Sequence, residues 1–325
     1  MRIQEKPKAS DRAGRPYRKP LRESAPRYPV RLAFNWSIPN TLACRTPLGS
    51  STGPGAEGGS RAESDTVGAM LFDFSLLPLD EIKPWGKPGT LSLHWFGLTD
   101  GHYWMDVGQS TLFEYNEAAR QLGAPRYCNY QVARQYEDVV EALPHIMEPV
   151  PADLMPYLSG EGRWRTTDCM AAWSEAQPER DDDYWSTVED AVTWIGRREL
   201  STAHLSPSVD FVMWSDDEAV HIEWDNRAKL LQGVPAWSAA YGTYRLPREQ
   251  FAEEVRTFHE RLMRAMAERV ESVVAGALPS EVRVDIPGLL REQKMRASLS
   301  DTNFGPPPAA TDWGAVRQAI KTIYA

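Results

Sequence analysis

The stretch PREQFAEEVRTFHERLMRAMAERVESVVAG, Pro247 to Gly276, has the strongest periodicity in the chain. Its apolar residues recur every three or four positions, which places them along one side of an α-helix for about seven turns. They are Phe251, Val255, Phe258, Leu262, Met266, Val270 and Val273. The pattern predicts one long amphipathic helix over about 247–275, which we expect to pack across a sheet.

Strand patterns precede this helix. The runs DFVMW (210–214) and AVHIEW (219–224) flank the polar connector SDDE, and this arrangement predicts a β-hairpin with a four-residue turn. YGTYRL (241–246) predicts a further strand. A β-sheet therefore leads directly into the long helix.

A second strand-rich region is SLHWFGLTDGHYWMDVG, Ser92 to Gly108. Apolar and polar residues alternate over 91–95 and again over 102–107, and Asp100-Gly101 between them favours a turn with positive φ. We expect a hairpin here, completed to a meander by a third run over 111–115. An apolar run over 71–77 comes before it.

Helical patterns lie between and after these strands. Apolar residues over 132–143 fall on one helix face, and Pro144 is expected to end or kink that helix. DDDYWSTVEDAVTWIGRREL (181–200) has acidic residues at its start and Arg197 and Arg198 near its end, as a helix favours. Further helices are expected near 286–299 and 313–324. The predicted fold class is α+β, with antiparallel hairpins and a meander covered by helices.

The chain divides by composition into three parts. Residues 1–69 contain eight prolines and seven glycines and carry twelve Lys and Arg against six Asp and Glu, so we predict a disordered basic leader. Globular patterning begins at Met70, and we hypothesise that translation starts there, with 1–69 an upstream extension of the reading frame. Residues 70–299 form an α+β region, either one domain or two lobes of about 70–200 and 201–299. Residues 300–325 form a linker and a short C-terminal helix.

Charge and hydropathy indicate the compartment and the kind of partner. Residues 70–325 carry 24 Lys and Arg against 39 Asp and Glu, so this acidic body should repel nucleic acids. There is neither an apolar run long enough to span a membrane nor an apolar signal-peptide core. We therefore predict a cytoplasmic protein that binds neither membranes nor nucleic acids. Ten of the twelve tryptophans lie between Trp85 and Trp237, which indicates a packed aromatic layer or a ligand-facing groove.

Two groups of polar side chains are candidate catalytic residues. The first is His94, Asp100, His102 and Asp106, whose imidazole and carboxylate groups suit zinc or iron. The second is His221 and Glu223 in HIEWDN, which share one strand face and fit part of a two-histidine, one-carboxylate site. The alternative interpretation, which we favour, is that both groups form the solvated faces of hairpins.

Other chemistries lack their sequence signatures. No Gly-x-Ser-x-Gly elbow, Walker loop or Gly-x-Gly-x-x-Gly pattern occurs. The cysteines have no zinc spacing, and Cys128 and Cys169 lack a catalytic signature, so we interpret both as structural. We predict no cofactor and no bound metal.

Several long motifs together resemble a known family. LPLDEIKPWG, LHWFGLTDGHYWMDVG, YQVARQYEDVVEALPHIMEPVP, VHIEWDNR and YRLPREQFAEEVRTFHERLMRAMAERV occur in this order. The chain resembles an actinobacterial family known only as a domain of unknown function, from about Met70 to about Leu299. The resemblance implies a recurring fold and no activity.

Two hypotheses on function remain. The favoured one is a non-enzymatic, immunity-type or regulatory protein that presents an acidic, aromatic-rich surface to another protein. The alternative is an enzyme with a metal or His/Asp site built from the two hairpins. These patterns leave enzymatic activity undecided.

Overall fold

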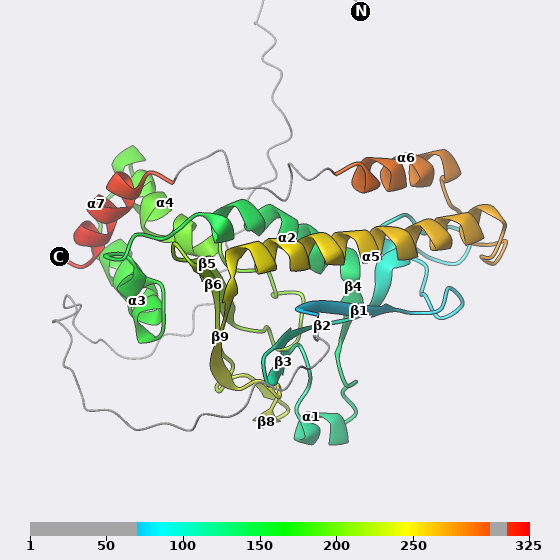
Figure 1. The fold of residues 1–325 in the computed structure, drawn as a ribbon, viewed down its shortest axis with the longest axis horizontal. Helices are drawn as coiled ribbons and strands as arrows, with labels where there is room; N and C mark the ends of the chain where they lie inside the picture. The colour runs from blue at the N-terminus through cyan, green and yellow to red at the C-terminus, as the bar shows by residue number, and fades with distance from the viewer. Residues whose placement is uncertain (1–69, 300–310) are drawn as a thin grey trace, which may run out of the picture. The chain divides into compact units, whose positions relative to one another are not determined.

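The computed structural model describes residues 70–299 and 311–325. The predicted basic leader, 1–69, and the start of the predicted linker lie outside this range. Within it, the chain forms the predicted α+β fold of helices and antiparallel sheets (Figure 1). No described helix is long and apolar enough to cross a membrane.

The first sheet is built around β2 (Asp100–Val107), whose burial alternates along its length. β2 pairs with β1 (Phe72–Leu76), β3 (Ser110–Leu112) and β4 (Cys128–Gln131), and all three pairings are antiparallel. The β2–β3 connection turns at Gly108, which has φ 72°. The third run of the predicted meander thus occurs as β3.

The prediction of a hairpin over 91–107 is wrong. Residues 91–95 form no strand in this sheet: Ser92 makes isolated bridges to Trp85 and Arg283, and a short 3₁₀ helix, η1 (Gly97–Thr99), leads straight into β2. Leu93 and Trp95 are buried, and the Trp95 indole N–H donates to Gln293 Oε1 at 2.7 Å. The alternating burial at Leu93 and Trp95 therefore comes from packing against a helix that is distant in the sequence.

Gly101 has a role that the turn interpretation missed. It lies inside β2, opposite Leu76, and is not among the glycines with positive φ. A Cβ at this position would lie 2.5 Å from the Ser75 carbonyl oxygen. Glycine is required here because β1 approaches too closely for any side chain.

The second sheet has the order β5 (Phe211–Ser215), β6 (Ala219–Asp225) and β9 (Tyr241–Pro247), all antiparallel. This confirms the predicted 210–224 hairpin and the strand after it. The short strands β7 (Leu230–Leu231) and β8 (Val234–Pro235) form a separate ribbon between β6 and β9. Alternate residues of β6 are buried, as its sequence predicts.

Helices cover both sheets. α5 (Arg248–Val274) begins directly after β9 and is the predicted long helix. It packs beside α2 (Val132–Met147), and both lie along the same side of the first sheet (Figure 1). Pro144 does not end α2: it lies inside the helix, which continues to Met147. The remaining helices are α1 (Glu117–Gln121), η2 (Met155–Tyr157), α3 (Glu161–Ala176), α4 (Asp182–Gly196), α6 (Ile286–Ala297) and α7 (Trp313–Ile323).

The buried residues form two clusters. The larger one joins α2, α5 and the first sheet to the apolar side of β6, with Phe72 stacked on Phe258 at 5.5 Å between ring centroids. The smaller one joins α3, α4 and α7 to Val212 and Trp214 of β5. Five tryptophans are fully or almost fully buried: Trp95, Trp194, Trp214, Trp224 and Trp237. Packing therefore accounts for half of the tryptophans between Trp85 and Trp237.

Replacing Gly101 with alanine should destabilise the protein strongly. The new methyl group collides with the backbone of β1, so the strands must separate; we expect a loss of about 3 kcal/mol or more in the free energy of unfolding, measured by urea denaturation. Gly196→Ala is the matched control, because a Cβ there meets no atom within 4 Å. A Gly101→Ala protein as stable as the control would contradict the close approach of β1.

Candidate functional site

The candidate residues of the first group lie in two different environments. His94 is exposed and packs edge-on against Trp85, with 4.4 Å between ring centroids. It lines a cavity of about 290 Å³ with Arg283, Asp285 and Glu292. Both carboxylates already have roles: Asp285 accepts a hydrogen bond from the Gly288 amide, and Glu292 pairs with Arg296 at 2.9 Å.

Asp100, His102 and Asp106 lie along β2 and share its polar face. Burial raises the pKa of Asp100, although the Gly101 backbone and nearby positive groups oppose this. His102 lies opposite Asn129 of β4, and its Nδ1 is buried without a hydrogen-bond partner among residues 70–299 and 311–325. Asp106 accepts a hydrogen bond from the Thr111 hydroxyl at 2.7 Å. The contacts of these three residues are those of polar side chains along one face of a sheet.

His221 and Glu223 lie on one face of β6, as predicted. The His221 ring stacks on Trp214 at 4.2 Å, and its Nε2 lies 2.8 Å from Asp216 Oδ2. Burial opposes ionisation of Asp216, but hydrogen bonds from His221 and from two backbone amides outweigh it and lower the pKa to about 2. Glu223 accepts a hydrogen bond from the Gly160 amide at 2.5 Å.

The structure does not bring these six residues together. His94 lies beside α6, His102 lies in the first sheet and His221 lies in the second. Within the described part of the chain, no group of three His, Cys, Asp or Glu side chains is arranged to hold a metal ion. Strand alternation predicts which residues of one strand share a face. It does not predict whether side chains from different strands come together in one site.

Sequence reasoning missed a hydrogen-bonded pair of titratable residues, of which the tyrosine is buried and the histidine half-buried. The Tyr103 hydroxyl lies 3.1 Å from His204 Nε2, and the His204 ring packs against Tyr130 at 4.2 Å. Burial raises the pKa of Tyr103 well above its ordinary value. Burial and the nearby Arg134 lower the pKa of His204 to about 4. At neutral pH the tyrosine is therefore protonated and the histidine neutral, which suits an O–H···N hydrogen bond.

Tyr103 lies too deep to contact a substrate, whereas His204 is half-buried. Only 1% of Tyr103 is exposed, and burial raises the pKa of the adjacent Cys128 thiol to about 12. No local motif could have revealed the pair, because Tyr103 and His204 are 101 residues apart. Its role is to anchor the 201–207 segment to the first sheet.

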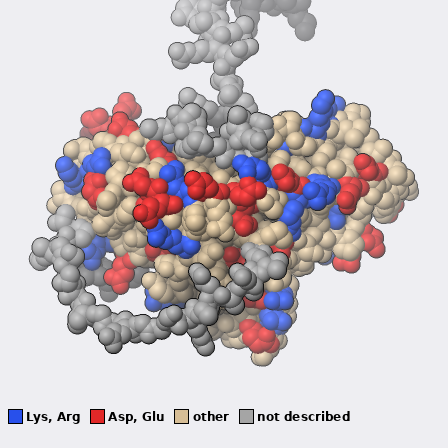
Figure 2. Space-filling model, in the orientation of Figure 1, with Lys and Arg blue, Asp and Glu red and all other residues tan. Residues whose placement is uncertain are grey.

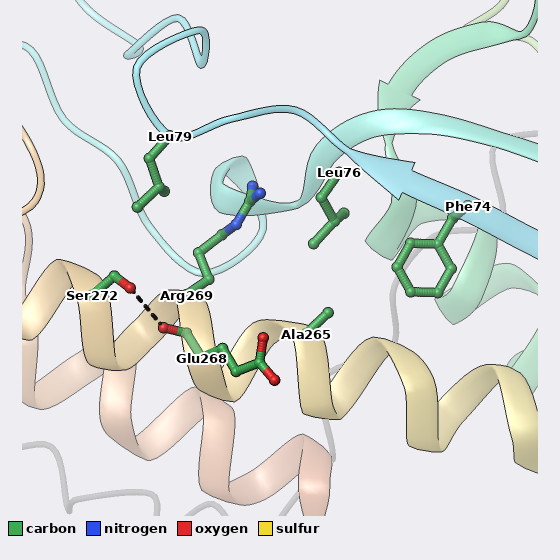
Figure 3. Close-up of a pocket in the computed structure, with 7 residues that line it drawn as sticks. All are labelled: Phe74, Leu76, Leu79, Ala265, Glu268, Arg269 and Ser272. Carbon is green, nitrogen blue, oxygen red and sulfur yellow. Dashed lines mark hydrogen bonds between the residues drawn. The ribbon is translucent and has the colours of Figure 1, made fainter.

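A groove lies between β1 and α5, with a volume of about 350 Å³. Phe74, Leu76 and Leu79 point toward the helix and form its apolar wall (Figure 3). Arg269 crosses it and donates to the carbonyl oxygens of Leu98 and Leu77 at 2.6 and 2.5 Å. This guanidinium is already bonded to the backbone, so the groove offers an apolar wall on the β1 side, with Glu268 and Ser272 of α5 on the other side.

Exposed aromatic and acidic side chains meet on α4. Asp182, Trp185 and Glu189 are exposed and, at spacings of three and four residues, share one face of the helix; we call them the α4 surface. Trp185 is 53% exposed, the highest value for a described tryptophan. Beneath it, Tyr184 stacks on Trp173 at 5.4 Å. The stack holds the start of α4 rigidly against α3.

A cation lies at the start of α4, because Arg180 packs over the Tyr184 ring at 5.6 Å, but the carboxylates of the α4 surface are not neutralised by ion pairs within the described residues. Among the described residues, neither Asp182 nor Glu189 has an ion-pair partner. Burial and the neighbouring carboxylates of Glu189 and Asp312 raise the pKa of Asp190. This differs from α5, where Figure 2 shows positive and negative side chains interspersed along the helix. The α4 surface thus combines a negative field with an exposed indole.

The fold and its sites define an α+β protein whose candidate catalytic residues are dispersed. A family model described as "Family of unknown function (DUF5984)" matches residues 71–319. The chain belongs to this family, in agreement with the resemblance seen in its motifs. No curated protein and no solved structure matches the chain.

The Tyr103–His204 pair predicts a pH dependence of stability. His204 has a folded pKa of about 4, below its ordinary value of 6.5, so acid protonates the unfolded chain first. The stabilisation from a neutral His204 is complete above pH 6.5 and is lost as the pH falls toward 4. Allowing for solvent screening, we expect this loss to be about 1 kcal/mol, measured by urea denaturation at about pH 7 and pH 4.5.

The variant His204→Asn isolates this contribution, and its pH profile should be flatter than that of the parent. Asp138 is a useful control because burial raises its pKa to about 6, so its protonation stabilises the fold over the same range. Asp138→Asn should therefore steepen the acid loss. Parallel profiles for the parent and His204→Asn would show that His204 keeps its ordinary pKa.

Proposed function

We propose that this chain is a non-enzymatic protein-binding module of the cytoplasm, immunity-type or regulatory in kind. Its α4 surface binds a basic segment of another protein. The observation that supports this best is the exposure of Trp185 between two unpaired carboxylates on a rigid helix. Tryptophan, with tyrosine and arginine, is enriched in interface hot spots, because its large ring buries apolar area and its indole N–H finds a polar partner.

Charge complementarity identifies the partner. The α4 surface lies on a body whose sequence carries a large excess of acids, so a Lys- or Arg-rich protein segment is attracted and a nucleic acid is repelled. A guanidinium group also pairs with a carboxylate while it stacks on an indole face. The expected partner therefore presents arginine to Trp185.

Binding is better supported than the enzymatic alternative. An enzyme built on the hairpins needs His94, His102, His221 and their neighbouring acids to converge, and the described structure keeps them on separate elements. A binding surface requires exposed, preorganised side chains, which α4 supplies. The proposed role therefore rests on the geometry of one helix face.

A site-specific crosslinker can test this proposal. We would place a photoreactive phenylalanine at position 185 and irradiate the protein in cells of the producing organism. We expect one discrete stoichiometric adduct with a protein that has a basic segment. The same residue at position 164, whose tryptophan is 41% exposed on α3, is the matched control and should give no such adduct.

The captured protein is then purified and its affinity measured by calorimetry. Trp185→Ala should weaken binding at least about 30-fold, the size expected for an interface hot spot, whereas Trp164→Ala should not. Asp182→Asn with Glu189→Gln should reduce the salt dependence of binding. Failure to obtain a stoichiometric adduct, or equal affinity of the Trp185→Ala protein, would refute the proposal.

A further inference from the structure

The outer edge of β9 presents unused backbone hydrogen-bonding groups. Asn226 N–H donates to the Ala240 carbonyl at 2.6 Å, and residues alternate along an antiparallel pair, so the even-numbered residues of β9 direct their backbone groups toward β6. The N–H and C=O groups of Tyr241, Thr243 and Arg245 therefore point away from the sheet. Within residues 70–299 and 311–325, none of these groups has a hydrogen-bond partner, and all three side chains are exposed.

Two other outer strands, β1 and β5, are protected. On β1, Arg261 donates to the Phe72 carbonyl at 3.3 Å, and the Asp73 carboxylate accepts from the Phe74 amide at 2.8 Å. On β5, the Val150 amide donates to the Ser215 carbonyl at 2.8 Å. Exposed strand edges are usually blocked in this way because they pair readily with other strands. β9 has no such protection and no lysine or internal proline.

We propose that β9 pairs antiparallel with β9 of a second copy of this chain, about a twofold axis at Thr243. This register places Tyr241 opposite Arg245 of the other copy and Thr243 opposite its own equivalent. All outward N–H and C=O groups of these three residues are then satisfied. The dimer joins two three-stranded sheets into one continuous sheet.

The side chains of β9 complement themselves in this register. Arg245 and Tyr241 are 52% and 54% exposed. Within one chain Arg245 pairs with Glu218 at 2.7 Å and Arg227 lies over the Tyr241 ring at 4.5 Å, so in the dimer the apolar stem of Arg245 packs beside the opposing ring while both contacts are kept. Gly242 lies opposite Tyr244, so a large side chain meets the smallest residue; within each chain the Trp224 ring already covers Gly242 and the Tyr244 ring lies against Gly108. Thr243 pairs with threonine, a favourable cross-strand pair, and no like charges face each other.

Neighbouring registers fit less well. An axis at Gly242 places glycine opposite glycine and leaves Arg245 opposite no residue of β9. An axis at Tyr244 places Tyr241 opposite Pro247, which has no N–H to donate. Chemistry therefore selects Thr243 as the centre of the interface.

Sedimentation equilibrium of the full chain tests this dimer. We expect a mass of twice 36.6 kDa, measured up to about 1 mM protein because a small interface binds weakly. Thr243→Lys places two ammonium groups opposite each other and should raise the dissociation constant at least about tenfold. Within one chain the new lysine lies directly across from Glu223, so the monomer keeps its stability. Thr243→Val, which retains the shape, should remain dimeric.

Two further results identify the register. Mixing Thr243→Lys with Thr243→Glu protein should restore the dimer, because opposite charges then face each other. Thr243→Cys should form an intermolecular disulfide on oxidation, whereas Tyr241→Cys should not, since its two copies lie about 14 Å apart in this register. A monomer throughout the concentration range, or a dimer that Thr243→Lys leaves unchanged, would overturn the proposal. It uses residues different from those of the α4 surface, so either proposal stands without the other.

Discussion

The continuity of β9 and α5 is the constraint on which the described structure depends. β9 ends at Pro247 and α5 begins at Arg248, so the second sheet determines where the helix starts. Buried apolar residues from Phe251 to Val273 then carry the helix over the first sheet, where Phe258 stacks on Phe72 and contacts Tyr136 of α2 edge-on. Both sheets are thus packed on one rigid helix, and their polar faces are directed away from it.

Elements with strong periodicity could be predicted from the sequence, and elements defined by distant partners could not. α5, α2 and the β5–β6 hairpin have regular apolar spacing that local packing enforces. β2 instead pairs with β1, far upstream, while the alternation at Leu93 and Trp95 reflects burial under α6. α3 was missed because its buried positions include Arg163 and Thr166, which no apolar pattern would place inside.

The candidate sites show the same limit. The alternation of β6 correctly placed His221 and Glu223 on one face, but the sequence could not show that Trp214 and the Gly160 amide would occupy those side chains. The Tyr103–His204 pair has no local signal. Arg163 has no local sequence signal either. It is almost fully buried and binds both Glu199 and Asp210 at 2.8 Å. Such contacts depend on tertiary structure, whereas the helical spacing of Trp185 from Asp182 and Glu189 places these three residues on one face of α4.

Buried arginines also explain why β5 and β9 have different edges. Arg198, fully buried, donates to the Trp194 carbonyl at the end of α4 and pairs with Glu148 at 3.2 Å. Its own carbonyl accepts from the Met213 amide of β5. Removing either charge would leave the other buried and unpaired, which costs about 3–5 kcal/mol, so this segment is held firmly against β5. The helical layer therefore closes one edge of the second sheet, and β9, at the other edge, keeps the backbone groups available for a second chain.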